Sequence, residues 1–328
     1  MRVLVISPNF FDYPQVICEQ LGKMGIEADW FDDRPSSNSF VKAIIRINKN
    51  FISKFIEKYF QNMMQIIGDK KYDKVLIISG QSFSFSEEMV QQLKEKQSQA
   101  EFILYQWDSL ENFPYIERMH KFFDRCYSFD RRDVQKDTYI QFLPLFYSER
   151  YERIAAQHKK EYKYDLSFVG TAHPKKYKYV KEMALELNGV FPKQFIYFFF
   201  PSKLVYIYRK IKNVEFKNAK YSEFHFKALN GAQMDEIVTN SKCVLDSAQA
   251  NQNGLTIRVI EMLGAKKKII TTNEDVVNYD FYRPENVYVY NGGFDLNNVF
   301  FKSPYQEIED EIYKKYSLES WLKTLLNL

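Results

Sequence analysis

The chain has 328 residues, with 46 lysines and arginines against 42 aspartates and glutamates, so 46 − 42 gives a formal net charge of +4. That excess is too small to indicate a nucleic-acid-binding protein by charge alone. Hydrophobic residues make up 45% of the chain and aromatic residues 17%, which excludes disordered and fibrous proteins. A usual domain size of about 150 residues predicts two domains.

Signals for crosslinking, secretion and membrane insertion are weak in this sequence. The three cysteines lie far apart with no Cys-x-x-Cys spacing, which favours a reducing cytoplasm over a disulfide framework or a cysteine zinc site: Cys18, Cys126 and Cys243. The apolar run at the amino terminus is shorter than a signal peptide requires, so we expect a β-strand there. The most apolar window, Phe195–Tyr208, contains a proline and a lysine and falls short of the roughly 20 residues of a membrane span.

Strand-like and helix-like stretches alternate through the first half. We expect strands at Val3–Ile6, Ala28–Phe31, Lys74–Ser79 and Glu101–Trp107, and helices at Gln15–Met24 and Ser86–Lys96. Continuous apolar runs of this kind are typical of parallel strands that helices cover on both faces. The first half therefore reads as a βαβ domain with a parallel sheet.

A charged stretch from Ser148 to Lys163 separates this domain from a second series of the same kind. The second series runs through the strand Asp165–Val169, the strand Cys243–Leu245, the helix Thr256–Gly264 and the strand Lys268–Thr272, and the chain ends in an amphipathic helix at Ser317–Leu328. We predict an N-terminal domain over residues 1–150, a C-terminal domain over 151–305 and a helical segment over 306–328.

Several well-known cofactor motifs are missing. The eleven glycines contain no Gly-x-Gly, so neither the dinucleotide fingerprint nor the phosphate-binding P-loop occurs. The four histidines show no metal-ligand spacing, and no Asp-x-Asp is present to hold a divalent metal on a diphosphate. We predict neither a cofactor nor a metal ion.

The segment Asp246–Glu261 carries the densest polar chemistry. It follows a predicted strand, contains amides and Gly254, and opens a helix near Thr256. Free backbone N–H groups and the positive end of the helix dipole favour a phosphate at such a place. The alternative is a capped surface helix in which Arg258 and Glu261, three residues apart, form an ordinary intrahelical ion pair.

Three stretches resemble the donor-binding domain of GT-B glycosyltransferases: Asn253–Ala265, Lys266–Asn273 and Phe168–His173. The likeness is closest to the group 1 type enzymes of bacterial capsule and lipopolysaccharide clusters, including the spore-maturation-protein-like branch. It implies an α/β protein of two Rossmann-like domains that face each other across a cleft, and we expect the last helix to return to the N-terminal domain.

The resemblance also implies a donor site for a nucleotide-diphosphate sugar, most simply a UDP-sugar. Glu261 would accept hydrogen bonds from the ribose hydroxyls, whereas Asn253 stands where the family commonly has a first glutamate and carries no charge. Asn253 and Leu255 would meet the sugar, and the diphosphate would meet loop and helix residues around them. The complete donor set is Gly170, Thr171, His173, Lys175, Gln249, Asn253, Gly254, Leu255, Thr256, Arg258 and Glu261. His173 has the alternative of being a plain loop histidine before Pro174.

Candidate acceptor residues follow the strands of the first domain, because ligands of open α/β sheets bind outside the strand carboxyl ends. Asp108 is the candidate general base, with helix capping as its alternative. Asn9, Gln81 and Ser82 are candidate acceptor-binding residues, and ordinary turn chemistry would also explain them.

The region from Lys203 to Lys220 holds six lysines and arginines against one acid, Glu215, directly after the aromatic run Phe195–Phe200. Basic residues beside aromatic ones suit an anionic membrane surface. The alternative is a buried element followed by a solvated basic face.

Together these features predict a metal-independent hexosyl-type glycosyltransferase of bacterial surface-polysaccharide synthesis, with a saccharide or lipid-linked saccharide as acceptor. It would be cytoplasmic, with peripheral contact to the inner face of the cell membrane and no nucleic-acid partner. Two alternatives stay open: an epimerase that acts on nucleotide sugars with the same architecture, and a module that binds a nucleotide or phosphorylated ligand without catalysis.

Overall fold

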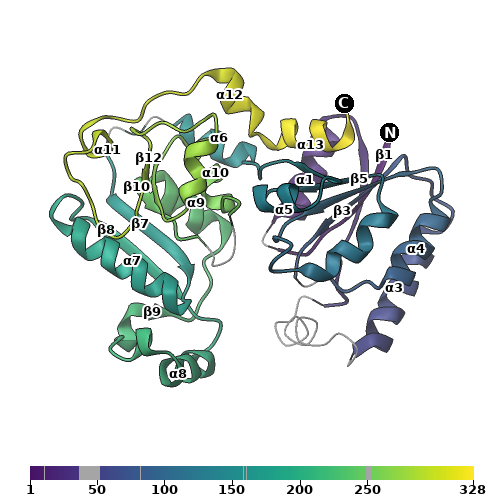
Figure 1. Cartoon of the computed structure of the whole chain (residues 1–328), viewed down its shortest axis with the longest axis horizontal. Helices are drawn as coiled ribbons and strands as arrows, with labels where there is room; N and C mark the ends of the chain where they lie inside the picture. Colours follow the sequence, from purple (N-terminus) through teal and green to yellow (C-terminus); the bar gives the residue numbers. More distant parts are fainter. Residues whose placement is uncertain (11, 37–51, 82, 158, 160, 249–252) are drawn as a thin grey trace. The chain divides into compact units, whose positions relative to one another are not determined.

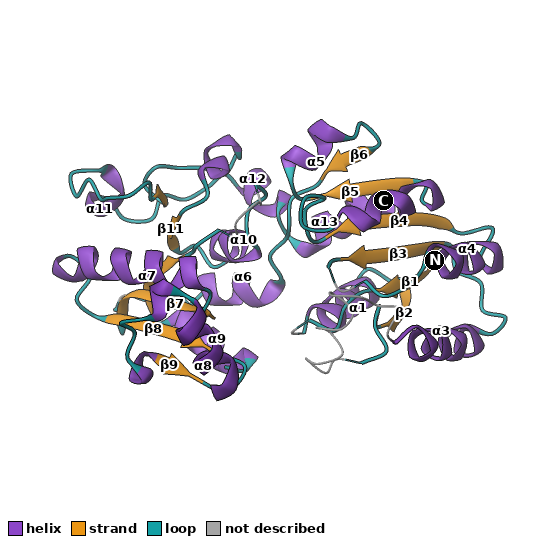
Figure 2. Cartoon of the chain, turned by 60° about the horizontal axis from the view of Figure 1, so that its bottom comes forward, coloured by secondary structure: helices purple, strands orange, loops and turns teal. Residues whose placement is uncertain are grey.

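The computed structural model describes residues 1–10, 12–36, 52–81, 83–157, 159, 161–248 and 253–328. The chain divides into two compact units. The first comprises Met1–Pro144, Asn251–Gly254 and Leu318–Leu328, and the second comprises Leu145–Ala250 and Leu255–Ser317. Each unit is a parallel sheet between layers of helices (Figure 1, Figure 2).

The sheet of the first unit has the strand order β2-β1-β3-β4-β5-β6, and every described pairing in it is parallel. Its strands are β1 (Arg2–Ile6), β2 (Glu27–Phe31), β3 (Lys74–Ser79), β4 (Glu101–Gln106), β5 (Arg125–Ser128) and β6 (Ile140–Phe142). Its helices are α1 (Tyr13–Lys23), α3 (Ser53–Ile67), α4 (Glu87–Lys96), the 3₁₀ helix η2 (Pro114–Phe122), α5 (Arg131–Lys136) and α13 (Leu318–Leu326).

Alternate residues of the central strands supply two cores. On one face, strand residues such as Leu4 and Ile77 pack with Phe60 of α3 and Val90 of α4. On the other face the Trp321 ring of α13 lies edge-on to the Tyr105 ring of β4, with 4.8 Å between the ring centroids. Helix α13 belongs to the first unit, so the chain ends in the N-terminal domain as the sequence predicted.

The second unit repeats the design, with the strand order β12-β11-β10-β7-β8-β9 and parallel pairing throughout the described strands. Its strands are β7 (Tyr164–Thr171), β8 (Gln194–Phe199), β9 (Phe224–His225), β10 (Ser241–Leu245), β11 (Lys268–Thr271) and β12 (Val287–Val289). Its α-helices are α6 (Glu149–Ala155), α7 (Pro174–Glu186), α8 (Lys203–Lys212), α9 (Gly231–Thr239), α10 (Ile257–Gly264), α11 (Val299–Lys302) and α12 (Asp310–Lys315). Its 3₁₀ helices are η3 (Leu187–Gly189), η4 (Val214–Phe216), η5 (Tyr221–Glu223) and η6 (Glu274–Asn278).

Aromatic side chains dominate the core of the second unit. Tyr177 of α7 lies within about 5 Å, ring centroid to ring centroid, of Phe198, Phe216 and Phe224. These rings join α7, β8, η4 and β9 in one cluster, which explains the dense run of aromatic residues in this part of the sequence.

The predicted fold class is confirmed: both halves are α/β units with parallel sheets. The strand predicted at Lys74–Ser79 coincides with β3, and the strand predicted at Asp165–Val169 is the central part of β7. Among the described residues, no helix combines the length and the apolar character that crossing a bilayer requires.

Candidate functional site

The strand order of the second sheet reverses between β7 and β10. From β7 the chain proceeds outward to β8 and β9, and from β10 it proceeds the other way to β11 and β12. The loops that follow β7 and β10 therefore diverge at the carboxyl edge of the sheet, which is where doubly wound sheets bind their ligands. Most of the donor residues predicted from the sequence lie on these two loops and the helices they open.

The first of these loops leads from Thr171 directly into α7. His173 is the residue before the helix and makes no side-chain capping bond, so the first N–H groups of α7 keep their capacity to bind an anion. Arg209 of α8 donates from Nη1 to the carbonyl oxygen of Ala172 at 2.7 Å. Burial, followed by the charges of Arg209, Lys176 and Lys175, lowers the pKa of His173. The start of α7 is thus a positively charged position.

Lys176 and Arg258 come together at this edge. Burial lowers the pKa of the Lys176 ammonium, the Asp246 carboxylate opposes that shift, and the Arg258 guanidinium adds to it. Neither cation forms an ion pair within the part of the chain that the structure describes. The intrahelical ion pair between Arg258 and Glu261 that the plain-helix interpretation predicts is therefore not formed. Two half-buried cations remain available to an anion.

Asp246 fixes the opening of α10. This residue follows β10 and is nearly fully buried, and its Oδ1 and Oδ2 accept hydrogen bonds from Thr256 Oγ1 at 2.8 Å and Thr271 Oγ1 at 2.9 Å. Thr256 precedes α10 and uses its hydroxyl on Asp246 instead of on the helix amides. Asp246 thus positions the loop and leaves the first amides of α10 uncapped by Thr256.

Glu261 lies further along α10 and faces α6. Its carboxylate accepts a hydrogen bond from the Tyr151 hydroxyl, and burial together with this carboxylate holds the pKa of Tyr151 well above its usual value. The positive charge of Arg258 opposes this shift and lowers the pKa of Tyr151. Glu261 is therefore a buried acceptor whose orientation depends on Tyr151.

The remaining predicted donor residues have other surroundings. Asn253 and Gly254 belong to the first unit, where the Asn253 N–H donates to Asp130 Oδ2 at 2.8 Å and a side chain at Gly254 would strike the Phe129 ring. Gln249 lies outside the described residues. The side chain of Leu255 is buried in the second unit.

Two predicted donor residues on either side of the loop after β7, Gly170 and Lys175, have different surroundings. Gly170 lies in β7, and a Cβ there would come within 2.6 Å of the Phe168 ring, so the glycine makes room for that ring. Lys175 is exposed, one residue before the half-buried Lys176.

The structure therefore brings Thr171, His173, Thr256 and Arg258 to one edge of the second sheet. It adds Lys176 and Asp246, which the predicted donor set omits.

Sequence signals for these two residues exist. Asp246 directly follows a buried strand, the same pattern that selected Asp108. Lys176 directly follows Lys175, which the sequence selects, but the sequence does not show which of the two lysines points inward.

The first sheet has its own reversal, between β1 and β3. At its carboxyl edge Asp108 follows β4, and its Oδ2 accepts a hydrogen bond from the Gln81 N–H at 2.8 Å. A Cβ on Gly80 would lie 2.7 Å from the same oxygen, so Gly80 permits this approach. Asn9 follows β1, and its carbonyl accepts from Arg34 Nη2 at 3.3 Å. Ser82 lies outside the described residues.

Trp107, the residue before Asp108, belongs to a row of three aromatic rings. Tyr13 at the start of α1 lies edge-on to Trp107, with ring centroids 5.5 Å apart, and stacks with the exposed Phe10 at 6.4 Å. Flat apolar rings beside a carboxylate and backbone amides offer both stacking and hydrogen bonding to a polar ligand such as a sugar.

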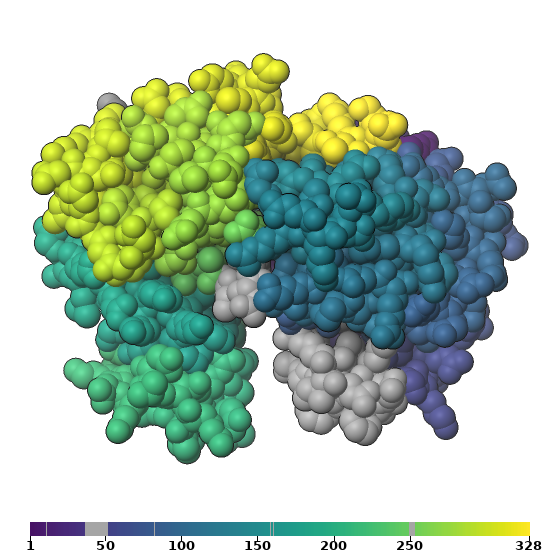
Figure 3. All heavy atoms as spheres, in the orientation of Figure 1, coloured from purple at the N-terminus to yellow at the C-terminus, as the bar shows by residue number. Residues whose placement is uncertain are grey.

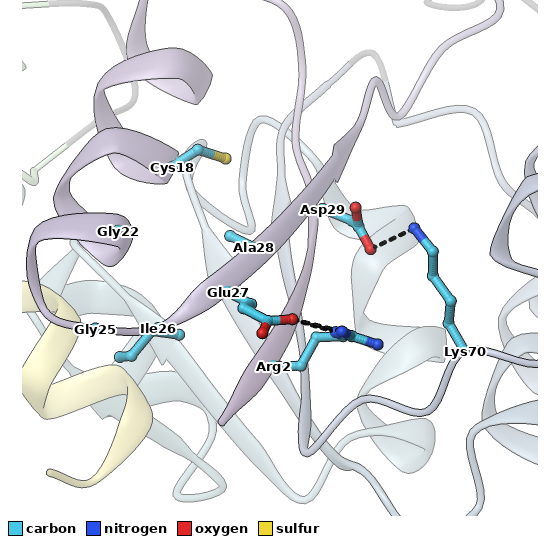
Figure 4. Close-up of a pocket in the computed structure, with 9 residues that line it drawn as sticks. All are labelled: Arg2, Cys18, Gly22, Gly25, Ile26, Glu27, Ala28, Asp29 and Lys70. Atoms are coloured by element: carbon cyan, nitrogen blue, oxygen red, sulfur yellow. Dashed lines mark hydrogen bonds and ion pairs between the residues drawn. The ribbon is translucent and has the colours of Figure 1, made fainter.

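A cavity of about 570 Å³ opens elsewhere in the first unit, close to the amino-terminal ends of β1 and β2 (Figure 4). Ion pairs occupy its wall: Arg2 with Glu27 at 2.5 Å and Lys70 with Asp29 at 3.0 Å. It lies at the sheet edge opposite to the strand carboxyl ends, and its charged groups already pair with one another. This cavity is therefore not a candidate for the donor or acceptor site.

Among the described residues, no three His, Cys, Asp or Glu side chains gather in a way that would hold a metal ion. The charge available to an anionic ligand at the β7–β10 edge comes from Lys176, Arg258 and the residues around His173.

No known family model and no curated protein sequence matches this chain. Solved structures do match. The lipopolysaccharide outer core galactosyltransferase WaaB in its apo form has 12% identity and a TM-score of 0.55, covering 100% of this chain and 99% of its own. Anabaena Alr3699/HepE in complex with UDP and glucose has 10% identity and a TM-score of 0.55, with coverage of 100% and 98%. The UDP-GlcNAc 2-epimerase from Neisseria meningitidis bound to UDP-GlcNAc has 11% identity and a TM-score of 0.53, with coverage of 100% of both chains.

The chain has the GT-B fold. Full coverage at these scores extends the likeness over both units, in agreement with the fold that the sequence motifs predicted. Identities of 12% or less establish the fold and leave the activity to the residues of the site. The GT-B matches also include a transferase and an epimerase, so the fold alone does not choose between these two reactions.

Proposed function

We propose that the protein is a glycosyltransferase that moves a sugar from a UDP-sugar to the hydroxyl group of a saccharide or lipid-linked saccharide. The observation that carries the proposal is the pair of half-buried cations, Lys176 and Arg258, which lack an ion-pair partner among the described residues and lie at the reversal point of the second sheet. A diphosphate is the ligand that suits them, because charge-assisted hydrogen bonds to phosphate are short and strong.

In the proposed reaction the bond between the anomeric carbon and the diphosphate oxygen breaks, and a bond from that carbon to the acceptor oxygen forms. The acceptor proton passes to a base, for which Asp108 is our candidate. Lys176, Arg258 and the first amides of α7 would stabilise the charge that develops on the leaving UDP, the kind of preorganised electrostatic stabilisation that dominates many enzymes. This arrangement needs no divalent metal, and we propose a metal-independent, hexosyl-type reaction.

The residues divide the remaining roles. Glu261 would accept hydrogen bonds from the ribose, with Tyr151 holding its carboxylate in place. The rings of Phe10, Tyr13 and Trp107 would take the acceptor saccharide. Anabaena Alr3699/HepE has been solved with UDP and with UDP-glucose, which supports a uridine nucleotide as the first donor to test. A setting in bacterial surface-polysaccharide synthesis is part of the proposal.

Epimerisation is the second candidate, favoured by the match to a UDP-GlcNAc 2-epimerase over the full length of both chains. One experiment separates the two. The protein is incubated with UDP-glucose or UDP-GlcNAc, with and without saccharide acceptors and with a chelator present, and the products are identified by mass spectrometry and NMR. A new glycosidic bond that appears only with acceptor supports transfer. A 2-epimeric sugar formed without acceptor supports epimerisation, and UDP binding without turnover supports a binding module.

A further inference from the structure

Helix α8 exposes a continuous apolar stripe. Leu204, Ile207, Tyr208 and Ile211 are 78%, 51%, 61% and 78% exposed, and they follow one another at the three- and four-residue spacing of a single helix face. We call these four residues the α8 stripe. Val214, just after the helix, is 78% exposed and extends the apolar surface. Single exposed apolar residues are ordinary, whereas a contiguous stripe indicates a binding surface.

The opposite face of α8 attaches the helix to its unit. Tyr206 is buried, and its ring lies 5.5 Å from Phe200 and 5.2 Å from Phe224, centroid to centroid. Arg209 donates to the carbonyl of Ala172. The side chains of Tyr206 and Arg209 project about 150° from the middle of the stripe, by the 100° turn between successive helix residues. The helix is therefore held by one face and presents the other outward.

Positive charge borders the stripe on both sides. Lys203 and Lys212 lie at its two edges on the helical wheel, and the exposed Lys217 and Lys220 follow in the next segment. None of these four lysines forms an ion pair with any residue that the structure describes. From Lys203 to Lys227 there are seven lysines and arginines and two glutamates, so 7 − 2 gives +5. One of the two acids, Glu223, is already paired with Lys181.

We propose that α8 docks on the surface of an anionic lipid bilayer, with the stripe in the boundary between headgroups and acyl chains and the lysines directed to the lipid phosphates. An apolar face flanked by lysines is the pattern of helices that lie in a membrane interface, since the long lysine stems cover apolar surface while their ammonium groups stay in water. Each lysine near an anionic leaflet contributes about 1 kcal/mol to binding. A second copy of the chain is a poorer occupant, because stripe-to-stripe contact would bring two surfaces of +5 together.

The position of α8 in the fold connects this surface with the candidate donor site. The helix starts four residues after the end of β8, at the same sheet edge as the loop from β7 to α7, and Arg209 donates a hydrogen bond to that loop. In Figure 1 α8 lies at one end of its unit beyond β9, and the space-filling view shows this part as a lobe of the unit (Figure 3). The docking of α8 on a bilayer does not depend on the proposed function. Its use in catalysis does rest on that function, since docking would bring the donor loop close to a lipid-linked acceptor.

The test is co-sedimentation of the full chain with vesicles, in the absence of donor and acceptor. Vesicles of phosphatidylcholine alone are compared with vesicles that also contain phosphatidylglycerol. We expect binding to the anionic vesicles that weakens with added salt. The double variant Leu204→Ser/Ile211→Ser should weaken binding about tenfold or more, because two apolar side chains no longer enter the interface. The triple variant Lys212→Gln/Lys217→Gln/Lys220→Gln should weaken it to a similar extent and reduce the salt dependence.

The matched control is Leu185→Ser, which removes an apolar side chain that is 70% exposed on α7, outside the stripe. It should bind vesicles like the unchanged chain. Absence of binding to anionic vesicles, or equal binding by the stripe variant and the control, would overturn the proposal. A dimer that the stripe variant dissociates would assign the stripe to a second copy instead. UDP affinity is measured on the same proteins, so that a failure of the membrane proposal stays distinct from a failure of the donor site.

Discussion

The two sheets end in loops of opposite chemical character. In the first unit, the carboxyl edge carries the Asp108 carboxylate, held by the Gln81 N–H, with the rings of Tyr13 and Trp107 beside it. In the second unit, the corresponding edge carries Lys176 and Arg258 next to the start of α7. The strands that lead to these loops are apolar and similar in both units, so the distinction arises in the few residues that follow each strand.

This difference suggests how one architecture, used twice, serves two ligands. Cations and uncapped helix amides suit a diphosphate, whereas aromatic rings and a carboxylate suit an uncharged, hydroxyl-bearing molecule. If the assignment is correct, substitutions in the first unit should affect turnover and leave UDP affinity unchanged. Substitutions in the second unit should affect UDP affinity itself.

The largest effect should come from Asp108→Asn. Removing a general base typically lowers the rate by about 10²- to 10⁴-fold, and the amide cannot take the acceptor proton. We expect transfer to fall by that factor while the UDP dissociation constant, measured by calorimetry, stays the same. Asp108→Glu keeps a carboxylate and should retain part of the activity. Unchanged turnover in Asp108→Asn would show that Asp108 only supports the loop through Gln81.

The second largest effect should come from Lys176→Met and Arg258→Met. Hydrogen bonds to charged groups contribute about 1.5–3 kcal/mol, so each change should weaken UDP binding by about 10- to 100-fold. Lys175→Met is the matched control, since Lys175 is the exposed neighbour in the sequence. A loss of affinity in Lys175→Met equal to that in Lys176→Met would mean that general positive charge, and not the inward-facing lysine, attracts the ligand.

The difference between Lys175 and Lys176 illustrates what the sequence could predict. Strands such as Lys74–Ser79 are evident from their unbroken apolar runs, because a strand buried on both faces tolerates few polar residues. The loops at the strand ends were selected because ligands of open α/β sheets bind outside the strand carboxyl ends, and their role as ligand sites stays a prediction. Which of two adjacent lysines faces Asp246 depends on how α7 is rotated about its own axis. The packing of Tyr177 and Val180 in the core sets that rotation.

Three further outcomes depend on tertiary structure that sequence spacing does not contain. Asn253 and Gly254 directly precede Leu255, yet they pack with Asp130 and Phe129 of the first unit. Arg258 and Glu261 have the spacing of an ion pair, but Glu261 accepts a hydrogen bond from Tyr151 on α6. Arg258 lies near a second cation, Lys176, and its charge lowers the pKa of that lysine. The sequence marks the region around α8 as basic and close to an aromatic run, while the exposure of the α8 stripe is evident only in three dimensions.

A smaller effect should distinguish the ribose from the diphosphate in the second unit. We expect Glu261→Gln to weaken UDP binding by about tenfold, in the range of a hydrogen bond to a charged group. Inorganic pyrophosphate has no ribose, so its affinity should not change. Tyr151→Phe should produce a milder loss for UDP only, because it releases the carboxylate without removing it. Equal losses for UDP and pyrophosphate would indicate that Glu261 supports α10 and not the ribose.

The smallest effect concerns the pH dependence of UDP binding. Burial and the charges of Arg209, Lys176 and Lys175 lower the pKa of His173, so the imidazole is neutral in the free protein near neutral pH. A bound diphosphate brings negative charge to the start of α7, which favours the imidazolium and raises the pKa of His173 in the complex. Because the diphosphate binds more tightly when His173 is protonated, the protein takes up a proton at His173 on binding. The affinity for UDP should therefore rise as the pH falls through the raised pKa of the complex.

His173→Gln isolates this contribution, because glutamine donates a hydrogen bond but does not titrate. UDP itself takes up a proton at a pKa of about 6, and the resulting loss of charge weakens binding at low pH in both proteins alike. The informative quantity is thus the ratio of the two dissociation constants across the pH range, measured by calorimetry in buffers of different ionisation enthalpy. We expect this ratio to change a few-fold in favour of the unchanged chain as the pH falls. A constant ratio would place His173 away from the diphosphate and leave Lys176, Arg258 and the α7 amides as the groups that bind it.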